Sequence, residues 1–197
     1  MDLTLLKEAI ASKSYDQVAD ICDELELQFA ARGVNYQNEW PYAIHLLGHI
    51  YVQDINNARF IWKRTPSAIK ESQPEVVAVW KIGQCLWTHD YAGVHDAIRG
   101  FDWSAEVKDL VSAFSESYTK RMFDLLSSAY STITVADVTK FLGLSEEGVT
   151  NYALQHGWTI DPESKMLTVR KMPKVVQQKL DPSKLQNLTE YVFHLEH

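Results

Sequence analysis

Two histidines spaced four residues apart, His45 and His49, are the side chains whose types and spacing come closest to a metal-dependent active site. On a helix this spacing puts both imidazoles on one face, as a zinc site requires. In the HExxH pattern of zinc proteases a glutamate beside the first histidine is the general base, whereas Leu46 occupies that position here. Since no third ligand lies at motif spacing, we expect no metal and interpret both histidines as residues of the core or of a groove.

Other sequence patterns for catalysis or cofactor binding are missing. The 8 glycines form neither a GxxxxGK nor a GxGxxG phosphate-binding loop, and no serine stands in a GxSxG nucleophile elbow. The acidic run Asp20–Glu26 alternates carboxylates with apolar residues at helical spacing, which predicts a solvated helix face. We therefore expect no catalytic residue, no cofactor and no metal, and a protein that is not an enzyme.

Charge and hydropathy limit the possible partners. The 197 residues include 19 basic and 26 acidic ones, and the formal net charge of −7 is unfavourable for binding a phosphate backbone. The longest uncharged stretch, Trp40–Gln53, is shorter than the ~18 residues that cross a bilayer. The acidic N-terminus does not resemble a secretory signal. These features argue against nucleic-acid and membrane partners and predict a location in the cytoplasm and nucleus.

Residues 1–130 are predicted to form consecutive amphipathic helices, because apolar residues recur there every three or four positions. A weak repeat begins at Tyr15, Ile55 and Tyr91, each time after a short polar turn. Its spacing of ~36 to 40 residues is close to the tetratricopeptide period. We expect a right-handed, tetratricopeptide-like array of helical hairpins, in which a glycine such as Gly48 lets two helices approach closely.

The composition changes around residue 131, and a unit of a different type is predicted for residues 131–170. The expected elements are a strand at 131–134, a helix at 135–142, a helix at 145–157, and a hairpin of strands at 158–161 and 166–170. Gly143 is expected to close the first helix and Ser145 to cap the second. This order is that of a winged helix, and the whole chain is predicted to be mostly α-helical, of the α+β class.

The second helix of this winged helix lacks the residues that enter a DNA groove. It has no Lys or Arg, and Glu146 and Glu147 lie at the end that would meet phosphate. We therefore expect protein contacts, made where an edge strand of the hairpin pairs with another sheet. The residues predicted for this contact are Leu167, Thr168 and Val169.

A connector at 171–180 leads to a predicted C-terminal helix at 181–197, which Asp181 and Pro182 would begin. Its apolar positions form a narrow, heptad-like seam of Leu185, Leu188, Val192 and Leu195. Such a helix either folds back on its own domain or joins helices of a partner. The seam is narrower than the stripe that helices usually bury locally, so we predict that these four residues contact a partner.

An array of helical hairpins followed directly by a protein-binding winged helix resembles the PCI domain. That domain occurs in small non-catalytic subunits of the proteasome lid, the COP-nine signalosome and translation initiation factor three. Residues 133–147 (ITVADVTKFLGLSEE) are similar to the PCI winged-helix pattern. Three further stretches, 57–66 (NARFIWKRTP), 155–158 (QHGW) and 188–192 (LTEYV), resemble the family of the eighth, smallest signalosome subunit.

This resemblance implies a non-catalytic subunit of a hetero-oligomer that removes the ubiquitin-like protein NEDD from cullin-RING ubiquitin ligases. Such a complex regulates ubiquitin-dependent proteolysis and, in plants, represses photomorphogenesis; its metalloprotease is another subunit. The implied partners are other signalosome subunits, especially PCI-domain subunits, whose winged helices join edge to edge and whose C-terminal helices form a bundle. The alternatives are a free-standing tetratricopeptide-like adaptor that binds peptides, or a PCI subunit of the proteasome lid or of translation initiation factor three.

Overall fold

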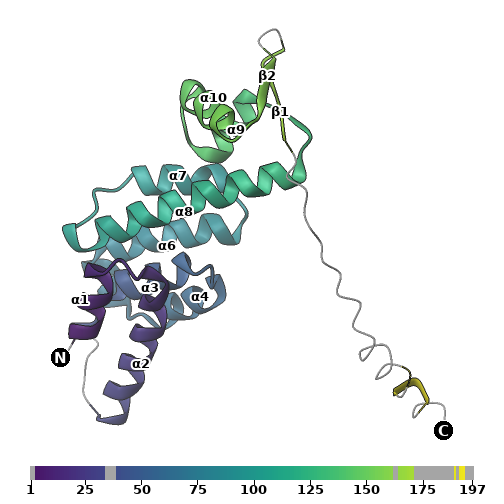
Figure 1. Ribbon diagram of the computed structural model, residues 1–197. Helices are drawn as coiled ribbons and strands as arrows, with labels where there is room; N and C mark the ends of the chain where they lie inside the picture. The colour runs from purple at the N-terminus through teal and green to yellow at the C-terminus, as the bar shows by residue number, and fades with distance from the viewer. Residues whose placement is uncertain (1–2, 34–38, 162–163, 171–188, 190, 194–197) are drawn as a thin grey trace.

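The structure is a computed structural model that describes residues 3–33, 39–161, 164–170, 189 and 191–193. These residues are mostly α-helical, with one small antiparallel sheet that follows the helices (Figure 1). The prediction of a mostly helical α+β chain is confirmed. Among the described residues, no helix combines the length and the apolar character that a membrane crossing requires.

The helical array, residues 4–129, is a stack of paired helices. Its elements are α1 (Thr4–Ala11), the 3-10 helix η1 (Tyr15–Gln17), α2 (Val18–Ala31), α3 (Tyr42–Tyr51), α4 (Ile55–Arg64), α5 (Ser67–Ser72), α6 (Pro74–Trp87), α7 (Tyr91–Arg99) and α8 (Ala105–Ala129). The stack rises from α1 and α2 through α3 and α4 to α6, α7 and α8 (Figure 1). Each neighbouring pair buries the apolar stripe that its sequence periodicity predicts.

The weak sequence repeat marks the same position in successive helix pairs. Ile55 begins α4 and Tyr91 begins α7. Just before them, Asp54 and Asp90 cap these helices, since each side chain accepts a hydrogen bond from the backbone N–H three residues later. Two of the three copies therefore consist of a turn, an aspartate cap and the second helix of a pair, whereas the first copy, at Tyr15, begins the 3-10 helix η1 without a side-chain cap.

α3 is the most enclosed helix of the array, because α2, α4, α6 and α8 all pack against it. Every residue from Tyr42 to Ile50 is buried. The predicted close approach at Gly48 is confirmed, since a Cβ there would lie 3.0 Å from Cγ1 of Val18 in α2. The position of α3 thus carries its two histidines into the interior.

The sheet unit, residues 132–168, follows the array directly. Its elements are β1 (Thr132–Thr134), α9 (Val135–Leu142), α10 (Glu146–Gln155), β2 (Thr159–Asp161) and β3 (Met166–Thr168), in the order expected for a winged helix. Both predicted caps are confirmed. Gly143 ends α9 in the left-handed conformation with a φ of 63°, and the Ser145 side chain accepts from the N–H of Gly148 at the start of α10.

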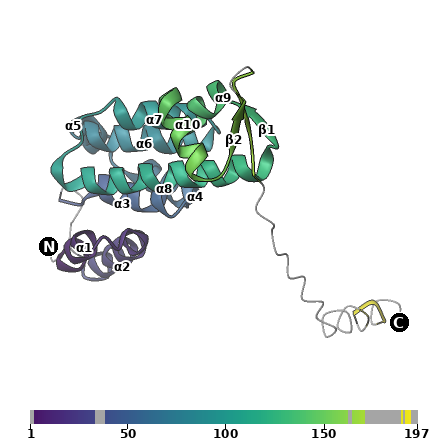
Figure 2. The ribbon, with the colours of Figure 1, turned by 45° about the horizontal axis from the view of Figure 1, so that its top comes forward.

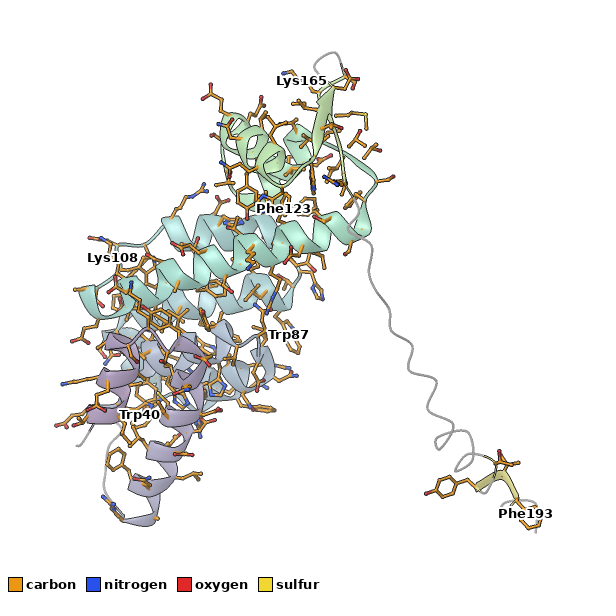
Figure 3. All side chains as sticks on the ribbon, in the orientation of Figure 1. Trp40, Trp87, Lys108, Phe123, Lys165 and Phe193 are labelled. Carbon is orange, nitrogen blue, oxygen red and sulfur yellow. The ribbon has the colours of Figure 1, made fainter. Side chains whose placement is uncertain are left out.

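α7 and α8 join the array to the sheet unit. In Figure 2, α8 runs the width of the array and ends at β1. Phe123 of α8 stacks on Trp158 with ring centroids 4.5 Å apart, and Figure 3 shows it between α8 and the sheet unit. On the α7 side, Nε2 of buried His95 donates to the carbonyl oxygen of Phe141, 3.0 Å away. Aromatic packing and this hydrogen bond hold the two parts together.

Candidate protein-interaction surfaces

The free edges of the sheet are β1 and β2, because the strand order is β1-β3-β2. β3 is paired on both sides, as Leu167 lies opposite Ile133 in β1 and Ile160 in β2. The expectation that Leu167, Thr168 and Val169 belong to an edge strand is therefore wrong, whereas their contact with a partner stays a prediction. Leu167 and Val169 are buried in the core, and a strand paired on both sides has no free backbone groups for a partner.

A hollow of about 540 Å³ lies beside the β2 edge. Its lining combines the start of α10 with the edge strand and the hairpin turn, and the residues are Val135, Glu146, Glu147, Thr150, Asn151, Ile160 and Lys165. Figure 3 shows Lys165 at the tip of the hairpin, away from the array. The two exposed glutamates outweigh the one lysine and make the lining acidic on balance, so this face suits a partner that brings a strand and basic side chains.

The predicted C-terminal seam lies mainly outside the described residues. Leu185, Leu188 and Leu195 are not among them. Val192 is described, and its side chain is exposed, as are those of Tyr191 and Phe193. Three consecutive exposed apolar residues are unfavourable in water, which is consistent with a contact surface for a partner.

The structure brings a third polar group to the histidine pair. Asp23 of α2 lies against α3, where its Oδ1 is 2.9 Å from Nε2 of His45 and 3.4 Å from Nε2 of His49. Both imidazoles are buried, at 0% and 3% exposure, whereas the Asp23 side chain is half-exposed. The prediction that the histidines lie in the core is confirmed, but Asp23 does not belong to a purely solvated face.

The proton positions in this cluster follow from Trp40. Its indole N–H donates to Nδ1 of His45 over 3.1 Å, so Nδ1 carries no proton. The neutral ring then holds its proton on Nε2 and donates it to Asp23. Burial lowers the pKa of His45, and Asp23 opposes this only in part, whereas the hydrogen bond from His45 lowers the pKa of Asp23. The pair is thus a neutral imidazole and a carboxylate.

Two small cavities border the cluster. One of about 200 Å³ is lined by Asp23 and His49, and the other, of about 220 Å³, by Trp40 and His45. Arg64 of α4 lines both cavities and forms an ion pair with Glu26 of α2. The ion pair therefore connects α4 with α2 beside the histidine cluster.

A model of the CSN8/PSMD8/EIF3K family matches residues 36–179, which include most of the array and the whole sheet unit. The chain belongs to this family. The match begins after α2, so the helix that carries Asp23 lies outside it.

Individual relatives extend the family likeness to both ends of the chain. The chain is 62% identical to the COP9 signalosome complex subunit 8 of Arabidopsis thaliana over 197 residues, which is 100% of both chains. It is 33% identical to the subunit 8 of Danio rerio over 184 residues, 91% of this chain and 96% of that one. The subunit 8 of Dictyostelium discoideum is 28% identical over 203 residues, with 100% and 98% covered.

Sequence reasoning about this family member missed Asp23 as a partner of the histidines. No motif spacing links residue 23 to residue 45, because the contact is made only when α2 packs on α3. One signal was present in the sequence. Asp23 directly follows Cys22, a member of the apolar stripe of α2, and therefore lies at the border of the buried face rather than opposite it.

Proposed function

We propose that this chain is a subunit of the COP9 signalosome that acts by assembling with the other subunits rather than by catalysis. The observation that carries the proposal is the 62% identity to the Arabidopsis thaliana subunit 8 over the full length of both chains. The array, the sheet unit and the C-terminal residues are all included in that alignment. The likeness therefore includes every part of the chain that the relative could use for contacts in its complex.

The geometry supports an assembly role. The sheet unit presents unpaired edges at β1 and β2 beside an acidic hollow, and Val192 is exposed near the end of the chain. Edge strands and exposed apolar side chains are features by which proteins associate. Under this proposal the chain contributes to deneddylation of cullin-RING ligases in the cytoplasm and nucleus, and the hydrolytic site belongs to another subunit.

Charge reversal at the acidic hollow tests the role of the sheet unit. Glu146→Lys combined with Glu147→Lys should abolish co-purification with the other subunits, because the two exposed side chains would repel a basic partner. Asp16→Lys with Asp20→Lys is the matched control, since it makes the same charge change at exposed positions of η1 and α2. Equal co-purification of both double variants would contradict a contact at the hollow.

The C-terminal residues are tested separately with Leu188→Asp combined with Val192→Asp. If these side chains pack against partner helices, the burial of unpaired carboxylates costs several kcal/mol and the chain is lost from the complex. The melting temperature of the isolated chain should stay within a few degrees, because Val192 is already exposed there. A large fall in melting temperature would show instead that the segment packs on its own chain.

A further inference from the structure

We propose that Asp23, His45 and His49 form a zinc-binding site that the indole N–H of Trp40 holds closed. One ligating atom from each of the three residues lies within 4.8 Å of the others. Two ligands of a tetrahedral zinc ion are about 3.3 Å apart, given Zn–N and Zn–O distances near 2.0–2.1 Å. The distances from Oδ1 of Asp23 to the two Nε2 atoms, 2.9 and 3.4 Å, bracket this value.

The donor set and its support suit a divalent transition metal. Imidazole and carboxylate ligands favour zinc over calcium or magnesium, which prefer oxygen alone. All three residues stand on helices, and α2 and α3 pack directly on each other. The ligands are therefore held in place before an ion arrives, which reduces the ordering that binding requires.

Trp40 prevents His45 from acting as a ligand in the present arrangement. Zinc at Nε2 requires a lone pair on that atom, so the proton of the neutral ring would have to move to Nδ1. Nδ1 would then be a donor that faces the indole N–H at 3.1 Å, and two donors cannot bond to each other. As long as the Trp40 hydrogen bond exists, only Asp23 and His49 can act as zinc ligands.

His49 is not restricted in this way. Its Nδ1 is a buried polar atom with no hydrogen-bond partner among the described residues. A move of the proton from Nε2 to Nδ1 therefore breaks no hydrogen bond at Nδ1 and exchanges the long contact with Asp23 for a bond to zinc. The two histidines of α3 thus differ in their ability to bind zinc. The cause of the difference is the indole N–H of Trp40, which bonds to Nδ1 of His45 but not to that of His49.

The surroundings allow an ion to enter and to complete its coordination. The cavity of about 200 Å³ that touches Asp23 and His49 has room for a water molecule as the fourth ligand. Arg64 lines this cavity, but its charge is offset by the ion pair with Glu26. Trp40 stands before α3, outside both ligand-bearing helices, and its buried ring contacts Phe29 of α2 and His45 edge-on.

Removal of the indole N–H is the decisive test. Tag-free, chelator-treated full-length chain is titrated with Zn²⁺ by calorimetry, as the native protein and as Trp40→Phe, which keeps an aromatic ring but not the donor. We expect the variant to bind one zinc at least ~tenfold more tightly than the native chain, the scale on which neighbours of metal ligands act. Trp40→Phe with His49→Ala should lose this binding.

Trp80→Phe is the matched control, because Trp80 is a buried tryptophan that stacks on Trp62 rather than on a histidine. It should leave zinc affinity at the native level. The ¹⁵N side-chain spectrum of the native chain should show His45 with its proton on Nε2, and this signal should change when Trp40→Phe is saturated with zinc. The proposal is overturned if Trp40→Phe binds zinc no better than the native chain, or if His45 carries its proton on Nδ1.

Discussion

Two helices of the array each bury a histidine, α3 with His45 against α2 and α7 with His95 beside the sheet unit, and they do so by different means. His45 lies between two side chains, a donor from Trp40 and an acceptor from Asp23. His95 donates to a backbone carbonyl and contacts Gly143, where a Cβ would come within 2.4 Å of its ring. Burial lowers the pKa of both histidines.

The surroundings of His45 are a cluster of side chains, whereas the contact of His95 with the backbone of the sheet unit, which we call the joint, is fixed by the path of the chain. Side-chain partners can be exchanged one at a time, so the cluster around His45 can gain or lose a function by single substitutions. The contact at His95 depends on the path of the backbone between α9 and α10, where only glycine fits. The joint therefore sets the orientation of the sheet unit on the array, which any assembly through the sheet edges requires.

The largest effect is expected from Gly143→Ala. The added Cβ is strained by the left-handed backbone at this position, and it also clashes with the ring of His95. We expect the two penalties together to lower the free energy of unfolding by about 3 kcal/mol. Gly33→Ala is the control, because Gly33 has a φ of 65° but nothing within 4 Å of an added Cβ; its loss should be about 1 kcal/mol. Equal losses in urea denaturation would contradict the close contact at the joint.

Asp23→Ala is expected to remove about 2 kcal/mol, since the buried Nε2–H of His45 loses its acceptor. Glu24→Ala, at the next position on α2, changes an exposed carboxylate and should stay within about 0.5 kcal/mol of the native chain. Thermal and urea unfolding measure both. A loss no greater than that of Glu24→Ala would show that the cluster does not stabilise the contact of α2 with α3.

Stability should fall as the pH is lowered from 7 towards 5, and His95 contributes to this fall. Burial, aided by Arg99, lowers its folded-state pKa below the ordinary 6.5, although the bond to Phe141 and the charge of Asp96 act in the other direction. The unfolded chain therefore takes up the proton first, and acid favours unfolding.

His95→Gln keeps an N–H donor for the carbonyl of Phe141 but does not titrate, and the hydroxyl of nearby Tyr118 stays protonated throughout because burial raises its pKa. The variant should show a shallower loss of stability between pH 7 and pH 5 in urea titrations. If the stability of the variant fell as steeply with pH as that of the native chain, His95 would not contribute to the pH dependence.

The smallest effects should be equal in the two regions. Asp54→Ala and Asp90→Ala each remove one helix cap, at equivalent positions of the repeat, and each should cost about 1 kcal/mol. Urea unfolding of both variants compares them directly. If one cap mattered several times more than the other, the two helix pairs would not be equivalent copies of one unit.

Features that depend on neighbouring residues could be predicted from the sequence. Gly143 as the end of α9 and Ser145 as the cap of α10 are decided within one turn of chain, and both predictions are confirmed. The order of helices and strands in the sheet unit follows from similar local signals. The helical nature of the array was predictable because its apolar period is sustained over many turns.

Features that depend on packing between distant segments could not be predicted in this way. β3 is the central strand because it pairs with β1, which precedes both helices in the sequence, as well as with β2. No local sequence pattern predicts the pairing of β3 with β1. Asp23 meets His45 for the same reason, across two helices. The role of Trp40 also depends on a contact between a connector and a helix, which spacing alone does not encode.

The central claim, that this chain works as a subunit of the COP9 signalosome, is tested most directly by native mass spectrometry. The full-length chain, tagged and expressed in its own cells, is purified under native conditions and its assemblies are weighed and identified. We predict one copy of the chain in a complex with the other signalosome subunits. Recovery as a free monomer, or with subunits of the proteasome lid or of translation initiation factor three instead, would contradict it.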